Sequence, residues 1–162
     1  MTEPRWLNAD ERRAWLAQVS INTLLPAALD TQLHNARKLS LFDYNVLAML
    51  SEADGRFLPM SELAARTSAS LARLSHVVTQ LQNRGWVERR PHPGDARVTT
   101  AHLTDAGMAT IVELAPGHVE AVRSLFLDAL NEKDVADLAR IGEKIVGRLD
   151  KDHWILRESK QA

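Results

Sequence analysis

Residues 63–87, LAARTSASLARLSHVVTQLQNRGWV, decide the fold of this chain. The stretch contains no aspartate or glutamate, although acidic residues make up 21 of the 162 positions. Apolar residues recur in it at helical spacing and predict one buried helix face. These positions are Leu71, Leu74, Val77, Val78 and Leu81. We therefore expect a helix with one apolar face and one cationic, acid-free polar face.

The sequence marks both ends of this helix. Ser70 is the natural N-cap, because its hydroxyl oxygen accepts hydrogen bonds from first-turn backbone amides. Gly85 is the expected stop at the other end. Residues 60–66 predict a short helix after Pro59, and a tight turn through Ser68 joins the two helices. Two helices joined in this way form a helix-turn-helix.

An arginine-rich hairpin pattern follows. Residues 86–90 and 98–103 predict two short strands, and PHPGD at 91–95 is a turn cluster between them. Residues 66–102 carry six arginines against two acidic residues, although the formal net charge of the whole chain is −1. Positive charge is thus placed at one surface, which suits a partner studded with phosphates because carboxylates there would be repelled.

Helical patterns lie on the N-terminal side of this segment. Residues 8–35 predict a long helix with a kink at Pro26. Ser40 and Asp43 have the spacing of a capping box and open the next helix, which ends at Asp54-Gly55.

More helices are expected after the hairpin. One begins at Thr104, breaks near Pro116-Gly117 and resumes over residues 119–130. A final helix begins near Glu132 and ends near Leu149, and the polar tail from residue 157 is expected to fray.

We predict a mainly α fold with a small β-hairpin wing: a winged helix-turn-helix core flanked by dimerisation helices. Residues 1–36 form the N-terminal dimerisation helix, 37–104 the DNA-binding domain and 105–162 the C-terminal dimerisation helices, in one compact intertwined unit. The outer helices carry more apolar surface than the central core needs, so we expect a symmetric homodimer.

The composition argues against several classes of protein. The absence of cysteine excludes disulfides, thiolate metal sites and cysteine redox sensors. The start, MTEPRW, lacks the apolar core of a signal peptide, and no apolar run approaches about 18 residues, so we expect a cytoplasmic protein without membrane contact. The six histidines lack metal-binding spacing, and no nucleophile motif or phosphate-cradling glycine loop is present. We expect no metal, no cofactor and no enzyme activity.

From about Trp6 to Leu149 the residues resemble the multiple-antibiotic-resistance regulator (MarR) family of bacterial transcription factors. MSELAAR at 60–66 with LARLSHVVTQL at 71–81 is similar to the family's helix-turn-helix, and RGWVERR at 84–90 to its entry into the wing. Asp95-Ala-Arg97, followed by Leu103-Thr104, is similar to its wing signature. One departure is Thr67-Ser68, where many relatives have glycine in the turn; serine adopts a left-handed conformation less easily.

The exposed face of the helix supplies candidate DNA contacts. Arginine prefers the O6 and N7 acceptors of guanine, so we expect Arg73, with His76, to contact base edges or phosphates in the major groove. Mixed phosphate and base contacts are expected from Ser70, Ser75, Thr79 and Gln80. The aligned amides at Ser70 also favour a phosphate. The alternative for each residue is a solvated helix face.

The hairpin supplies further candidates. The resemblance implies that Arg97 enters the minor groove or grips its backbone, while Asp95 steadies it by an ion pair. Arg89 and Arg90 adjoin on a strand and face opposite sides; we favour Arg90 for a phosphate and place Arg89 against the domain. The alternative is a solvated turn.

We predict a sequence-specific DNA-binding transcriptional regulator, a homodimeric repressor of an inverted-repeat operator relieved by a small aromatic ligand. Relatives typically bind such ligands where the dimerising and DNA-binding parts meet. Trp6, Trp15 and Trp154 are expected in the dimerising part, and Trp6 and Trp15 are candidates to line such a pocket, although tryptophans of this kind more often form interface core. Two alternatives stay open: a winged-helix protein-interaction module without specific DNA binding, which the pI of about 6.6 allows, and an enzyme.

Overall fold

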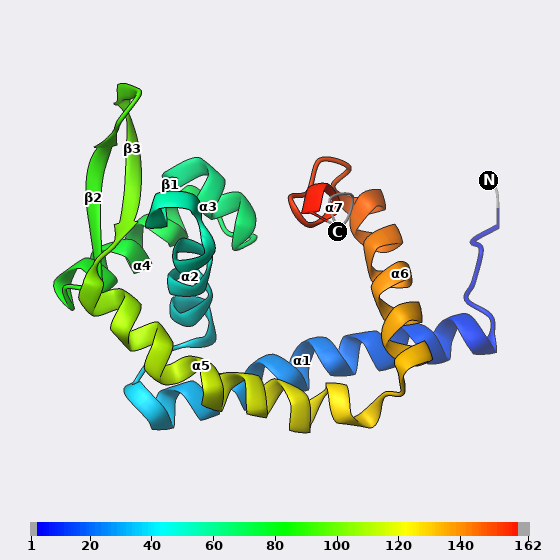
Figure 1. Ribbon diagram of the computed structural model, residues 1–162. Coiled ribbons are helices and arrows are strands. Elements are labelled where there is room, and N and C mark those ends of the chain that lie inside the picture. The colour runs from blue at the N-terminus through cyan, green and yellow to red at the C-terminus, as the bar shows by residue number, and fades with distance from the viewer. Residues whose placement is uncertain (1–2, 159–162) are drawn as a thin grey trace.

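The computed structural model describes residues 3–158. Helices α1 (Ala9–Arg37) and α5 (Asp105–Leu125) lie side by side along the base of the molecule. A winged-helix domain rises from one end of this base, and α6 (Glu132–Leu149) rises from the other (Figure 1). The outline is therefore a U, with the helix-turn-helix in one limb and the C-terminal helices in the other.

The winged-helix domain combines short helices with a small antiparallel sheet. Its elements in order are α2 (Leu41–Glu52), the 3₁₀ turn η1 (Asp54–Arg56), β1 (Phe57–Pro59), α3 (Met60–Arg66), α4 (Leu71–Asn83), β2 (Val87–His92) and β3 (Asp95–Leu103). The strand order is β1-β3-β2. The mainly α fold with a hairpin wing is confirmed, but β1 was not predicted, and both hairpin strands run further toward the turn than the sequence indicated.

Helix ends follow the predicted chemistry. At the start of α2, Ser40 Oγ accepts from the Asp43 amide at 3.0 Å, and the Asp43 carboxylate accepts from the Ser40 amide at 2.8 Å. Ser70 caps α4 by accepting from the Arg73 amide at 3.2 Å. Gly85, with φ +76°, turns the chain out of α4. Ser68 has φ 51°, so a serine occupies the left-handed turn position that favours glycine.

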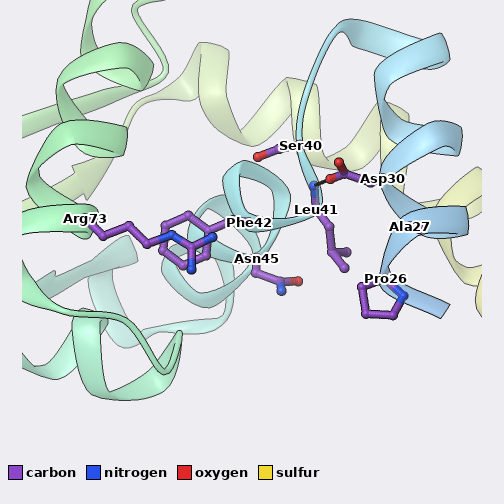
Figure 2. Close-up of a pocket in the computed structure, with 8 residues that line it drawn as sticks. All are labelled: Pro26, Ala27, Asp30, Ser40, Leu41, Phe42, Asn45 and Arg73. Atoms are coloured by element: carbon purple, nitrogen blue, oxygen red, sulfur yellow. Dashed lines mark hydrogen bonds between the residues drawn. The ribbon is translucent and has the colours of Figure 1, made fainter. Parts of the chain in front are cut away.

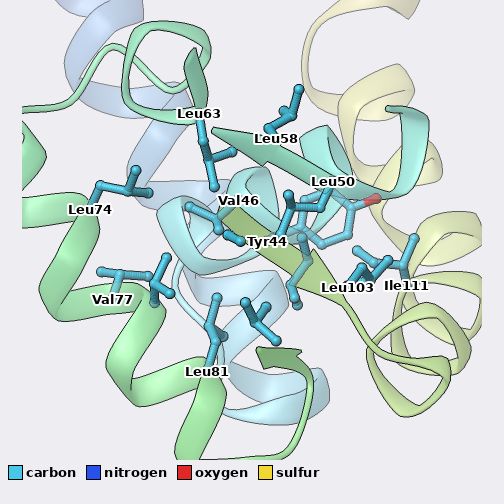
Figure 3. Close-up of a cluster of buried hydrophobic side chains, with 14 of the residues drawn as sticks. Tyr44, Val46, Leu50, Leu58, Leu63, Leu74, Val77, Leu81, Leu103 and Ile111 are labelled. Atoms are coloured by element: carbon cyan, nitrogen blue, oxygen red, sulfur yellow. The ribbon is translucent and has the colours of Figure 1, made fainter. Parts of the chain in front are cut away.

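The core lies between α2, α4, the start of α5 and the sheet (Figure 3). The largest fully buried side chains are Leu33, Leu39, Val46, Leu47, Leu50, Leu63, Leu74, Val78, Leu81, Val87 and Thr100. Leu71 is an exception to the predicted apolar face of α4, because it is 56% exposed. It is the first residue of α4, and the buried cluster begins one turn later at Leu74.

The expected break near Pro116-Gly117 is wrong, because α5 is continuous through both residues. A proline inside a helix lacks the N–H that would bond to the carbonyl four residues earlier, so local chemistry favours a break. Packing against α1 outweighs this: a Cβ at Gly117 would lie 3.6 Å from Gln32 Nε2 of α1. The helix ends instead at Leu125, before the 3₁₀ turn η2 (Leu127–Ala129).

The C-terminal arm turns back to the winged-helix domain. After α6, whose bounds agree with the prediction, the short helix α7 (Ile155–Glu158) reaches α3. Arg157 and Glu62 are 3.4 Å apart, Arg66 and Glu158 are 3.8 Å apart, and Arg66 lies over the Trp154 ring at 5.7 Å. Trp154 therefore contacts α3 of its own chain, and its expected place in the dimerising part stays a prediction. The rest of the tail expected to fray, residues 159–162, lies outside the described residues.

The outer helices leave much apolar surface uncovered. No residue of α6 is buried, and Leu149 near its end is 81% exposed. The α1 residues from 12 to 24 are all exposed, and they include Trp15, Leu16, Val19, Ile21 and Leu24. Within residues 3–158, no helix is long and apolar enough to cross a membrane. In the same part of the chain, no group of three or more histidine, aspartate or glutamate side chains is placed to hold a metal ion.

Candidate nucleic-acid interface

Helix α4 presents an exposed polar face of the kind that the sequence predicted. All the predicted contact residues on it are exposed, namely Ser70, Arg73, Ser75, His76, Thr79 and Gln80. No acidic residue lies in its first turn. His76 Nε2 and Gln80 Nε2 are 3.2 Å apart, so these two side chains are neighbours on one turn of the helix. The face therefore offers donors and acceptors without a carboxylate.

Arg89 joins the hairpin to α4. Its Nη2 donates to the Ser75 carbonyl at 2.7 Å and to Thr79 Oγ1 at 3.0 Å, and its Nη1 donates to Gln82 Oε1 at 3.1 Å. These bonds fix the angle between β2 and the exposed face of α4. They also occupy acceptor positions on Ser75 and Thr79, whose hydroxyls face Arg89 as well as solvent. The alternation of Arg89 and Arg90 on a strand predicted that one of them lies against the domain. It did not predict which residues of α4 that arginine would bind.

Arg90 lies on the exposed side of β2, as expected. Its Nε donates to Glu88 Oε2 at 3.0 Å, so the nearest anion is a residue on the same strand. The pair is exposed, and such pairs contribute only about 0–1 kcal/mol. A phosphate can therefore compete for Arg90 at little cost in stability.

Arg97 and Asp95 form a two-pronged ion pair beside the hairpin turn. Arg97 Nε donates to Asp95 Oδ1 at 3.0 Å, and Arg97 Nη2 donates to Oδ2 at 3.1 Å. Hydrogen bonds from Arg97 lower the pKa of the Asp95 carboxyl, so the carboxylate is ionised at neutral pH. The Arg97 side chain is 90% exposed. The ion pair that the family resemblance implied is confirmed, and it orients an otherwise solvated guanidinium.

Arg73 extends from α4 toward α2. Its guanidinium lies over the ring of Phe42, with 4.1 Å between its Cζ and the ring centroid (Figure 2). Both residues line a surface hollow of about 400 Å³, with α1 on its far side. The sequence placed Arg73 on the exposed face of α4, but it gave no signal that Phe42 would lie beneath it.

Two further arginines of the cationic segment, residues 66–102, have structural partners. Arg84 Nη2 donates to the Lys38 carbonyl at 3.0 Å, and its guanidinium lies 4.8 Å from the Trp86 ring centroid. Arg66 Nε donates to Glu62 at 3.0 Å. Part of the local positive charge therefore holds the domain together.

Trp6 and Trp15, the candidates to line a ligand pocket, line neither of the two hollows described for α1. Both side chains are exposed, Trp6 by 83%. A second hollow of about 290 Å³ lies between α1 and the end of α5, and Ile21, Leu25 and Phe126 are among its apolar lining residues. Neither tryptophan lines this hollow or the one beside Arg73.

Known proteins match both the sequence and the fold. A family model described as "MarR family" matches residues 39–98. The fold is similar to that of Sco3205, a MarR family transcriptional regulator from Streptomyces coelicolor solved in complex with DNA, with a TM-score of 0.87 and 37% identity over 93% of this chain and 94% of that chain. It is equally similar to AbsC, another MarR family transcriptional regulator from Streptomyces coelicolor, with a TM-score of 0.87 and 35% identity over 92% and 100% of the two chains.

A curated relative shares less of its length. The transcriptional repressor MprA from Escherichia coli (strain K12) is 27% identical over 107 residues, which are 66% of this chain. The match spans 60% of the length of MprA. Taken with the fold comparisons, these matches show that the chain belongs to the MarR family, whose members are transcriptional regulators and not enzymes.

Proposed function

We propose that the protein binds an inverted-repeat DNA operator as a homodimer and represses transcription until a small aromatic ligand releases it. The observation that carries DNA binding is the acid-free face of α4, fixed by Arg89 to a hairpin that presents Arg97 in a set orientation. Each subunit would lay α4 in a major groove and the hairpin in the flanking minor groove. The contact residues are Ser70, Arg73, Ser75, His76, Thr79, Gln80, Arg90, Asp95 and Arg97.

The dimer is supported by the uncovered apolar faces of the outer helices. Val135, Leu138, Ile141 and Ile145 lie on one stripe of α6, and all are exposed in the single chain. Contiguous apolar surface of this kind marks a site of association. A two-fold pair would present two copies of α4 to half-sites about one helical turn apart, roughly 34–36 Å.

DNA binding is tested by measuring affinity for the DNA upstream of the gene at increasing salt. If the dimer neutralises about 6–10 phosphates, affinity should fall by about 10³–10⁵ between 50 and 200 mM salt. The competitor is unrelated DNA of the same length. Equal affinity for both DNAs would reject sequence-specific binding, and an affinity that ignores salt would reject the phosphate contacts.

Release by a ligand is supported by the hollow between α1 and the end of α5. Its apolar lining suits an aromatic ring, and its place among the outer helices lets an occupant change their packing. A ligand shifts DNA binding only through different affinities for the two arrangements of the dimer. Operator affinity should therefore fall in the presence of one member of a panel of aromatic acids and antibiotics. Unchanged affinity across the panel would contradict this part of the proposal.

A further inference from the structure

Arg73 differs from the other arginines of the cationic segment in how its guanidinium is held. The other five donate hydrogen bonds to protein acceptors: Arg66 to Glu62, Arg84 to the carbonyls of Arg37 and Lys38, Arg89 to Ser75, Thr79 and Gln82, Arg90 to Glu88, and Arg97 to Asp95. Within residues 3–158, the Arg73 guanidinium has no hydrogen bond or ion pair to the protein. Its contact is with an aromatic ring.

The ring beneath Arg73 is a rigid platform. Phe42 lies in the first turn of α2, between Ser40 and Asp43, the two residues of the capping box that fixes the start of this helix. It is half-buried and packs against the core cluster. The acidic residue that lines the hollow, Asp30, accepts from the Leu41 amide at 2.5 Å and makes no ion pair with Arg73 (Figure 2). Phe42 is therefore held by the core, and no carboxylate draws Arg73 away from it.

Stacking and base recognition use different parts of a guanidinium. A cation–π contact uses its flat face, whereas recognition of guanine O6 and N7 uses the N–H groups at its edge. An arginine on a ring thus keeps its planar fork of donors available. A long side chain that is already oriented loses less conformational freedom when it binds.

The geometry points to Phe42 as a positioning residue that orients the donor edge of Arg73 toward one base pair in each half-site. This rests on the proposed DNA-binding function and assigns α2 a part in base preference. Phe42 itself touches no base. It acts through the face of Arg73, so its removal leaves the charge of α4 intact and loosens only the direction in which the fork points.

The test is selection of bound sequences from a random pool of double-stranded DNA by the full chain and its variants. Arg73→Ala should abolish base preference at one position per half-site. Arg73→Lys should do the same while it keeps the salt dependence of the wild type, because lysine retains the charge but lacks the fork. Phe42→Leu should lower preference at that same position by about two- to fivefold, the range expected for an exposed cation–π contact. Phe42→Tyr, which keeps the ring, should restore it.

A matched control separates positioning from stability. Phe57→Leu removes another half-buried ring of the winged-helix domain, one that stacks on His102 and does not contact Arg73. It should lower the unfolding midpoint, as Phe42→Leu should, yet leave the Arg73-dependent preference unchanged. Full preference in Phe42→Leu, or an even loss at every position, would overturn the inference while DNA binding stands. If the wild type enriches no sequence, the proposed function falls first, and the inference falls with it.

Discussion

Helices α4 and α6 are both amphipathic, yet only α4 has its apolar face covered by the rest of the chain. Helix α4 buries Leu74, Val77, Val78 and Leu81 in the winged-helix core. Helix α6 buries none of its residues. Within residues 3–158 every buried hydrophobic side chain lies between Leu29 and Leu114. One region therefore carries its own core, whereas the outer helices leave the apolar faces uncovered that the proposed dimer would bury.

The sharpest way to break this comparison is to place a charge on the uncovered face of α6. Ile145→Asp should convert the proposed dimer to a monomer, because the interface would then bury an unpaired charge at a cost of about 3–5 kcal/mol. Affinity for the operator should fall by about 100-fold or more, since 1.4 kcal/mol corresponds to tenfold. Sedimentation at several concentrations and DNA titration measure the two effects. Lys144→Asp, one residue away and off the apolar stripe, should leave the dimer intact; dissociation by both variants alike would place the interface elsewhere.

Helix α1 contains both kinds of position and allows the comparison within one element. Leu33 is fully buried in the winged-helix core, whereas Leu24 is 69% exposed. Leu33→Ala should lower the free energy of unfolding by about 2–5 kcal/mol at any protein concentration. Leu24→Ala should lower the apparent stability only through dimer dissociation, so its effect should depend on concentration. Urea unfolding at two protein concentrations distinguishes the two variants. The same concentration dependence in both would contradict the division of α1 into a core part and an interface part.

Within the winged-helix domain, the proposed roles of Arg73 and Arg97 differ. Arg73 is proposed to recognise a base, and Arg97 to bind DNA with little regard to its sequence. Arg73→Ala should weaken operator binding by about 1–3 kcal/mol and relax preference at one position per half-site. Arg97→Ala should weaken binding more evenly across sequences and reduce the salt slope by about one unit per subunit. Neither change should alter the unfolding midpoint much, because both side chains are exposed. Normal binding by both variants would remove the assignment of this surface.

The smallest expected effect is a pH dependence of stability at His118, where α5 meets the winged-helix domain. The ring centroids of His118 and of Tyr44 in α2 are 4.1 Å apart. Burial lowers the pKa of His118 below its ordinary value. The folded state thus favours the neutral ring, and below about pH 6.5 the unfolded state binds more protons. The free energy of unfolding should be highest above that pH. It should fall as the pH drops from there through the folded-state pKa of His118.

The pH dependence is checked by urea unfolding of the wild type and of His118→Gln at several pH values. The stability of the variant should fall less at low pH than that of the wild type. The rest has another source in His102, where burial and then Arg90 lower the pKa and Glu88 opposes them. A wild-type stability that rises on acidification would contradict the predicted direction of the pH dependence.

Local chemistry explains which parts of the fold could be predicted from sequence. The Ser40–Asp43 box, the Ser70 cap and the Gly85 stop act within a few residues, so they placed α2 and α4 correctly. Strand β1 could not be found in this way, because three residues acquire strand structure only by pairing with distant β3. The continuity of α5 through Pro116 also depends on a distant element, α1, whose packing overrides the local signal.

The same distinction applies to the candidate site. The sequence predicted which residues share the exposed face of α4, because helical spacing determines that face. It did not predict that Arg89 would bind Ser75 and Thr79, or that Arg73 would lie on Phe42. Those contacts join elements whose relative placement is set by the assembled core. The Asp95–Arg97 pair was expected only because the motif resembled a family signature.

The contact of α7 with α3 closes the two limbs of the U into a ring. Arg157 and Glu62, like Arg66 and Glu158, link the far end of the C-terminal limb to the helix that precedes α4. A displacement of that limb would therefore strain its contacts with α3, which the turn at Ser68 joins to α4. These ion pairs are partly exposed, so added salt should weaken them. The C-terminal limb is thus linked to α3, the neighbour of α4 in the chain, by ion pairs at the surface of the molecule.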